Sequence, residues 1–179
     1  WAGLAFAILT AVIAASVLAF FTLYYKTNII LGGIAINSLA SGGTIFFLYL
    51  AAHDKGTSVS LDSKVLPNIN IPFIEDIPVL GPAVSGHNIL TYLSILAVVF
   101  TFYLLKRTAL GYHIRAVGEK KEAADSVGIS VVRTQAIALV ISGVMSGLGG
   151  AFMSMGYVSW FSRDMVSGRG WIALAAEAM

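Results

Sequence analysis

The sequence predicts an all-α, polytopic membrane protein, a bundle of long apolar helices joined by two polar loops. Its residues are 58% hydrophobic and only 11% charged, against about 25% charged in ordinary soluble domains. Four stretches without Asp, Glu, Lys or Arg are long enough, or nearly so, to cross a hydrocarbon core of about 30 Å. Unpaired backbone groups cannot face lipid, and no stretch alternates like a barrel strand, so each should be a helix.

The first two expected spans cover residues 1–25 and 29–52, and neither contains a charged residue. Tyr24 and Tyr25 close the first span, which suits aromatic rings at the level of the lipid headgroups, and Lys26 follows in the interface. Because the link between the two spans is so short, they are expected to be antiparallel neighbours.

Residues 53–88 form an expected aqueous loop, which is long enough to need a task or short helices of its own. It contains all four prolines, and its acidic residues, Asp54, Asp62, Glu75 and Asp76, outnumber its basic residues, Lys55 and Lys64. Its segment "NINIPFIEDIPVLGP" has two open interpretations. It lies along the bilayer surface or receives an extracellular partner, or it is a proline-stiffened loop packed on its own bundle.

Two further spans, expected at residues 89–105 and 134–161, enclose a basic loop at 106–133. In this loop the basic residues outnumber the acidic ones, with Lys106, Arg107, Arg115, Lys120, Lys121 and Arg133 against Glu119, Glu122 and Asp125. Loops rich in Lys and Arg remain on the cytoplasmic side of a membrane. The 106–133 loop is therefore expected to be cytoplasmic and the 53–88 loop external.

Residues 168–179, which belong to the segment "SGRGWIALAAEAM" that begins at Ser167, are expected to start a further membrane element. Glu177 is costly in lipid, so it should face protein or water there. The alternative is a surface helix in which Glu177 is solvated. The chain begins at Trp1 without a basic n-region, so the first span is not expected to be a signal peptide, and the sequence is expected to be a stretch of a longer protein.

The composition argues against several classes of function. The chain has no cysteine, so disulfides and thiolate metal sites are excluded. His53, His87 and His113 lie far apart in the sequence, and no paired carboxylates or nucleophile with a base occur at usable spacing. We therefore expect neither a bound metal nor an enzyme active site. The net charge of +2 is too small to indicate nucleic-acid binding.

A short helix is expected over residues 119–127, inside the basic loop. Glu119 and Glu122 lie near its start, where the helix dipole favours carboxylates, and Gly128 follows in a position typical of a helix stop. The small apolar residues Ala123, Ala124 and Val127 share one side. This side is too shallow to anchor a membrane helix, and it suits docking into a groove on another protein. A plain connecting helix is the alternative.

Two faces of the expected spans combine small and polar residues. Asn37 and Ser41 lie on one face of the second span, and this face either packs on another helix or lines a path for a neutral polar solute. Gly143 and Gly147 form a GxxxG spacing in the fourth span, which favours close helix packing. The neighbouring Gly149–Gly150 pair is a place where this span is expected to bend.

Three segments, "ALGYHIRAVGEKKEAADSVGIS", "SGVMSGLGGAFMSMGY" and "SGRGWIALAAEAM", carry a family resemblance. They resemble the permease subunits of bacterial ABC importers for nucleosides and simple sugars, within the group that includes ribose and branched-chain amino-acid permeases. "NIILGGIAINSLASGG" and "IPVLGPAVSGHNILTYLS" are similar to the same branch. Family members are longer and have further membrane helices, so the resemblance implies an incomplete stretch of a multi-pass protein of the bacterial cytoplasmic membrane.

The resemblance implies that the loop matching Gly118–Ile129 is the coupling helix, which sits in a cleft of an ABC ATPase subunit. The coupling residues would be Gly118, Glu119, Glu122, Ala123, Ala124, Asp125 and Gly128. The chain contains no GxxxxGK[ST] phosphate loop, so ATP and Mg would bind to the partner ATPase and this chain would bind no cofactor. Further implied partners are a second permease, identical or related, and an extracellular or periplasmic substrate-binding protein or lipoprotein.

The expected cargo is a neutral solute such as a nucleoside or simple sugar, because none of the four spans contains a charged residue. The candidate pathway residues are Asn37, Ser41, Gly147, Gly150 and Tyr157, with Trp160 as a further aromatic group near the external end. The alternative function is an ATPase-independent channel or secondary carrier, in which the 106–133 loop is only a linker. Secondary carriers commonly have ionisable residues at mid-membrane, and none is found in these spans.

Overall fold

The computed structural model describes residues 1–54, 56–59, 66–69, 85–177 and 179. Four of its helices are long and apolar enough to cross a membrane. They are α1 (Ala2–Tyr24), α2 (Ile29–Ala52), α4 (Ile89–Arg107) and α7 (Val131–Ala151), the last extended by η1 (Phe152–Tyr157). The expected fold class, an all-α polytopic membrane protein, is confirmed.

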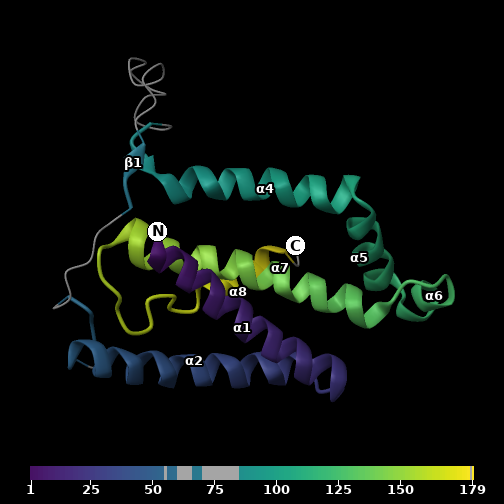
Figure 1. The fold of residues 1–179 in the computed structure, drawn as a ribbon, viewed down its shortest axis with the longest axis horizontal. Coiled ribbons are helices and arrows are strands. Elements are labelled where there is room, and N and C mark those ends of the chain that lie inside the picture. Colours follow the sequence, from purple (N-terminus) through teal and green to yellow (C-terminus); the bar gives the residue numbers. More distant parts are fainter. Residues whose placement is uncertain (55, 60–65, 70–84, 178) are drawn as a thin grey trace.

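Shorter elements join the long helices (Figure 1). Between α4 and α7 lie α5 (Ala109–Glu119) and α6 (Lys121–Ser126), and the chain closes with α8 (Arg169–Glu177). At the opposite end of the bundle from α6, β1 (Asn68–Ile69) pairs antiparallel with β2 (His87–Asn88), with Asn68 opposite Asn88. The segment "NINIPFIEDIPVLGP", for which two interpretations were open, lies almost entirely outside the described residues.

The helices α1 and α7 form the closest packed pair, and glycine is the reason. A Cβ added at Gly143 would lie 2.6 Å from Ala15 Cβ, and one at Gly147 would lie 2.9 Å from Ile8 Cα. Both glycines are buried. The GxxxG spacing therefore has the packing role that its sequence favours, with α1 as the partner helix.

The helix α2 turns back from the end of α1 and diverges from it toward its own C-terminal end (Figure 1). The turn is held by Thr27, whose Oγ1 donates to Phe21 O at 2.9 Å, and by Asn28, whose side chain accepts from Ile30 N and caps α2. Most large apolar residues of α2 are exposed, as expected for a helix that faces lipid or another membrane helix.

The fourth span differs from its expected form. We expected one helix over 134–161 with a bend at Gly149–Gly150, but the α-helix begins at Val131 and continues through both glycines. It changes at Phe152 into the π-helix η1, which ends at Tyr157. The helical hydrogen-bond pattern is thus not interrupted at the glycine pair.

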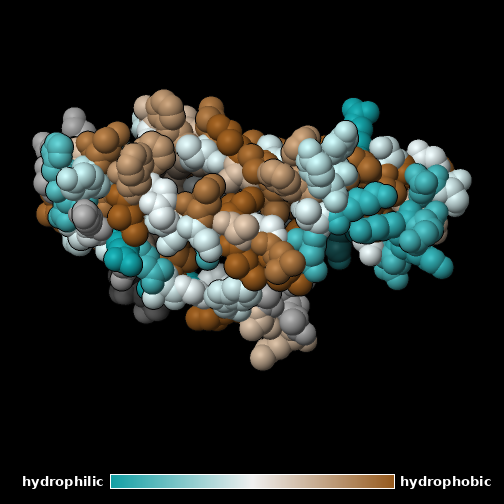
Figure 2. Space-filling model, turned by 90° about the horizontal axis from the view of Figure 1, so that it is seen from below, coloured by the Kyte–Doolittle hydropathy of each residue, from teal (hydrophilic) through white to brown (hydrophobic). Residues whose placement is uncertain are grey.

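The small buried core lies at the end where α4 begins and η1 ends. Leu66, Leu90 and Ala151 form its centre, and Leu4, Ala7, Ile89, Leu93, Phe152 and Met155 pack around it. On the face seen in Figure 2, apolar residues predominate in the middle, while hydrophilic residues gather at the α5–α6 end and also occur at the opposite end. This distribution matches a protein whose middle lies in lipid and whose α5–α6 end lies in water.

Candidate functional site

A sharp corner joins α4 to α5, and one threonine caps both helices there. Thr108 has an extended backbone, and its Oγ1 donates to Leu104 O at 2.6 Å and accepts from Gly111 N at 3.1 Å. It therefore satisfies a carbonyl of the last turn of α4 and an amide of the first turn of α5. Tyr112 adds a second tie across the corner, because its hydroxyl donates to Lys106 O at 3.0 Å.

The corner also requires glycine at position 111. Gly111 is buried, and a Cβ there would lie 2.6 Å from Leu105 Cα, a backbone atom that cannot rotate away. Only glycine allows the first turn of α5 to approach the last turn of α4 this closely. The orientation of α5 relative to α4 is thus determined by backbone packing.

The expected helix over 119–127 is wrong at its N-terminal side. Gly118 and Glu119 are the last residues of α5, and Lys120, with an extended backbone, separates α5 from α6. Lys120 N still donates to Ala116 O, so the last turn of α5 is complete before α6 begins at Lys121. Glu119 consequently lies at the C-terminal end of a helix, where its carboxylate is not favoured by the dipole.

The C-terminal end of α6 has the expected glycine stop. Gly128 has φ +84°, and its N–H donates to Asp125 O at 2.9 Å while Ile129 N donates to Ala124 O at 3.0 Å. These two bonds form a Schellman motif, which satisfies carbonyls that the helix leaves unpaired. The chain then enters α7 directly, because Thr134 N and Oγ1 both bond to Ser130 O.

The small apolar residues of α6 do not all share an accessible side. Ala124 is 3% exposed and packs inward, whereas Val127 is 73% exposed and Ala123 is also exposed. Glu122 and Asp125 are exposed as well. The outer surface of α6, which we define as Glu122, Ala123, Asp125 and Val127, therefore combines two carboxylates with two small apolar groups.

A cavity of about 480 Å³ lies between α5, the end of α6 and the start of α7. Leu110 and His113 line it from α5, and Val127, Arg133 and Ile137 line it from the other side. The α6 helix thus contacts the bundle through Ala124 and has space beside it. Among the described residues, no group of His, Asp and Glu is placed to hold a metal ion.

The five candidate pathway residues are not brought together. Asn37 and Ser41 are exposed on α2, and Gly150 is exposed on α7 with no heavy atom within 4 Å of an added Cβ. Gly147 instead faces α1, so its position supports the packing role. Tyr157 is the last residue of η1.

Sequence reasoning missed α5 and the two residues that position it, Thr108 and Gly111. A signal was present, because Leu110, Ile114 and Val117 repeat at the helical spacing and Thr108 is a good N-cap residue. The π-helix η1 had no comparable signal in its sequence "FMSMGY".

Comparison with known proteins gives a family and several relatives. The family model described as "Branched-chain amino acid transport system / permease component" matches residues 1–177. The guanosine ABC transporter permease protein NupQ of Bacillus subtilis is 37% identical over 159 residues, which are 85% of this chain and 47% of NupQ. The putative glucose ABC transporter permease protein TsgC13 of Haloferax volcanii is 31% identical over 98% of this chain and 52% of its own length.

A third relative is the nucleoside ABC transporter permease protein NupC of Lactococcus lactis, which is 28% identical over 98% of this chain and 55% of its own length. The chain thus spans about half the length of the curated relatives it matches. No solved structure matches it.

Proposed function

The chain belongs to the permease family of branched-chain amino acid transport systems, and from this membership we propose that it is part of the membrane subunit of an ATP-binding cassette importer. With four membrane-length helices it is a multi-pass protein of the cytoplasmic membrane. The imported solute would be a nucleoside or a simple sugar, since named relatives are permeases for guanosine, nucleosides and glucose.

The observation that carries the proposal is the construction of α6. It is a short helix with a buried anchor, Ala124, and an exposed outer surface, and it lies at the hydrophilic end of the bundle. The corner at Thr108 and Gly111 joins it through α5 to α4, and the Gly128 stop joins it to α7. A displacement of α6 would therefore move two membrane-length helices, which is what coupling to a partner ATPase requires.

Within this proposal the coupling residues have different tasks. Glu122, Ala123 and Asp125 would touch the ATPase, because their side chains are exposed on the outer surface of α6. Ala124 and Gly128 would instead position α6, the first through packing and the second through its left-handed backbone. Gly118 and Glu119 would act through the end of α5, next to the extended Lys120.

The remaining partners follow from the same class of transporter. ATP and Mg would bind to the ATPase, a second permease subunit, identical or related, would complete the membrane pathway, and a substrate-binding protein or lipoprotein would deliver the solute to the external end. The 106–133 loop would be cytoplasmic and the 53–88 loop external. Asn37 and Ser41 on α2, together with Gly150 and Tyr157, remain the proposed pathway residues, because the uncharged face of α2 offers an amide and a hydroxyl to a neutral solute.

The test is the exchange Ala123→Trp in the full-length permease, expressed with its ATPase and binding protein. We expect uptake and co-purification of the ATPase to fall at least about tenfold, since a bulky ring on the outer surface of α6 blocks a close-fitting cleft. Ala51→Trp is the matched control, because Ala51 is also exposed but lies at the far end of α2.

Both variants should insert into the membrane normally. Uptake that survives Ala123→Trp unchanged would contradict coupling through α6. Solute flux through the reconstituted permease without any ATPase would instead favour a channel or a carrier.

A further inference from the structure

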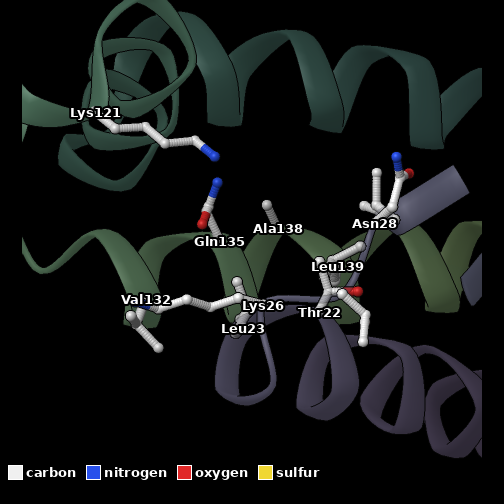
Figure 3. A pocket seen from close by; sticks show the side chains of 11 residues that line it. Thr22, Leu23, Lys26, Asn28, Lys121, Val132, Gln135, Ala138 and Leu139 are labelled. Atoms are coloured by element: carbon white, nitrogen blue, oxygen red, sulfur yellow. The ribbon is translucent and has the colours of Figure 1, made fainter.

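A cavity of about 760 Å³ lies between the α1–α2 connection, α6 and the first half of α7. Two lysines reach it from different elements, Lys26 from the α1–α2 connection and Lys121 from the start of α6. Figure 3 shows the Lys121 side chain extending from α6 with its ammonium group directed toward the amide of Gln135 on α7. The cavity is therefore lined by basic groups from segments far apart in the sequence.

The other polar side chains that line the cavity suit an anionic ligand. Asn28 and Gln135 provide side-chain amides, and no Asp or Glu is among the described residues that line the cavity. Ammonium groups together with amide donors are usual recognition elements for a phosphate group.

An apolar groove of about 570 Å³ lies between α1 and α2. Thr27 and Asn28 line both this groove and the cavity, so the two spaces are adjacent. Beyond these two residues the groove is lined by apolar side chains that follow the helices toward the middle of the membrane, including Leu18, Phe21, Leu31 and Leu39. A basic cavity thus lies beside an apolar groove that follows two membrane-length helices.

We propose that this pair of spaces binds an anionic phospholipid, with its headgroup in the cavity that Lys26 and Lys121 line and an acyl chain along the groove. Lys26 follows directly after the membrane-length α1, which places the cavity at the level of the lipid headgroups. Basic pockets at this level bind anionic headgroups. A soluble phosphate would satisfy the lysines but leave the groove uncovered, and a zwitterionic lipid brings its own cation to a site that already has two.

A headgroup in this position would link α6 to the α1–α2 connection. Among the described residues no hydrogen bond joins these two elements, and Lys121 is the residue of α6 that lines the cavity. The lipid would therefore hold the N-terminal end of α6 against the bundle, at the opposite end of this short helix from the Gly128 stop.

The proposal is tested on the purified full-length permease in detergent, by native mass spectrometry with phosphatidylglycerol, with phosphatidylcholine of the same acyl chains, and with inorganic phosphate. We expect phosphatidylglycerol to bind at least about tenfold more tightly than phosphatidylcholine, since two lysines near the headgroup favour the anion. The variant Lys26→Gln with Lys121→Gln should remove this preference. The matched control, Lys106→Gln with Lys120→Gln, removes two exposed charges from the same end of the bundle without altering the cavity lining and should keep it.

A third variant, Ala35→Phe, distinguishes binding of a lipid from binding of a free phosphate. Ala35 is exposed and lines the groove, so a phenyl ring there should weaken phosphatidylglycerol binding without changing any charge. Equal loss of the preference in both lysine pairs would overturn the proposal, because it would show a general charge effect. Inorganic phosphate that binds as tightly as the lipid, with no effect of Ala35→Phe, would overturn it in favour of a soluble anion.

Discussion

The two ends of the bundle are held by different kinds of contact. Where α4 begins, hydrogen bonds join segments far apart in the sequence: Phe161 N donates to Ser58 Oγ at 2.7 Å, and Asn88 Nδ2 donates to Leu66 O at 2.9 Å. At the α5–α6 end the side-chain bonds are local, such as those of Thr108 with residues three and four positions away. Long-range hydrogen bonds therefore join the first end to distant parts of the chain, whereas local hydrogen bonds within and between adjacent helices stabilise the second.

This difference has a mechanical meaning. Long-range hydrogen bonds break only when distant segments of the chain separate. The end of the bundle where α4 begins should therefore stay rigid, and we call it the fixed frame. Local caps keep α5 and α6 intact as helices, and the Gly111 corner and the Gly128 stop join them to α4 and α7, so a displacement of α6 is passed on to both long helices. A rigid small unit at one end and a fixed frame at the other is what a displacement transmitted from a partner protein requires.

The largest effect is expected from Asn88→Ala, which acts on the fixed frame. Asn88 is 6% exposed, caps α4 by accepting from Leu90 N at 3.0 Å, and donates to Leu66 O. Its removal loses a helix cap and leaves a buried carbonyl unpaired, so we expect the free energy of unfolding to fall by about 2–4 kcal/mol. Thermal unfolding in detergent, followed by tryptophan fluorescence, measures the loss.

The control for Asn88→Ala is the same substitution at the other end. Asn28 caps α2 through an equivalent bond, from Ile30 N at 2.9 Å, but it is exposed and this bond is local. Asn28→Ala should therefore cost only about 1 kcal/mol, the value of an ordinary N-cap. Equal losses in the two variants would remove the distinction between the two ends.

The second largest effect is expected from Gly111→Ala at the α4–α5 corner. The added methyl group would meet the backbone of Leu105, so the corner must open, at a cost of about 1–3 kcal/mol. Gly118→Ala in the same helix is the matched control, because no heavy atom lies within 4 Å of its added Cβ. Alanine should stabilise α5 there by up to about 1 kcal/mol. Opposite signs in thermal unfolding would show that close backbone approach requires Gly111.

How far these features were predictable depends on the physical source of each. The four long helices were evident in the sequence because a bilayer permits little else in long uncharged stretches. The Gly128 stop was also visible, since glycine favours the left-handed backbone that ends a helix. The division between Ala123 and Ala124 was not, because helical spacing gives relative directions and does not say which direction the rest of the chain covers.

The long-range ties were beyond sequence reasoning for a different reason. Ser58 and Phe161 are 103 residues apart, and neither belongs to a pattern that selects the other as its partner. The same holds for the Thr57–Ser162 bridge beside them. Local signals therefore predicted where α4 begins and where α6 stops, but not which distant residues are bonded to one another near the start of α4.

The third prediction concerns Gly128→Ala, which should act on α6 alone. A left-handed backbone costs a residue with a side chain about 1–2 kcal/mol, and Gly128 has φ +84° with no heavy atom within 4 Å of an added Cβ. We expect faster hydrogen exchange of the Ile129 and Gly128 amides, which close α6, with little change in the thermal unfolding of the bundle. A fall in global stability equal to that of Asn88→Ala would mean that α6 is not a separate unit.

The smallest effect is expected from Ser126→Ala, and its comparison with Ser58→Ala shows the two ends most directly. Ser126 is exposed and donates to Ala123 O at 2.8 Å within its own helix, so alanine, the better helix former, should change stability by less than about 0.5 kcal/mol. Ser58 is 7% exposed and accepts from Phe161 N, so the same exchange leaves a donor unpaired and should cost about 1–3 kcal/mol. The chemical change is identical in the two variants, so the difference in thermal unfolding compares a local hydroxyl bond with a long-range one. Equal small effects would mean that the long-range tie at Ser58 is not needed to hold the frame.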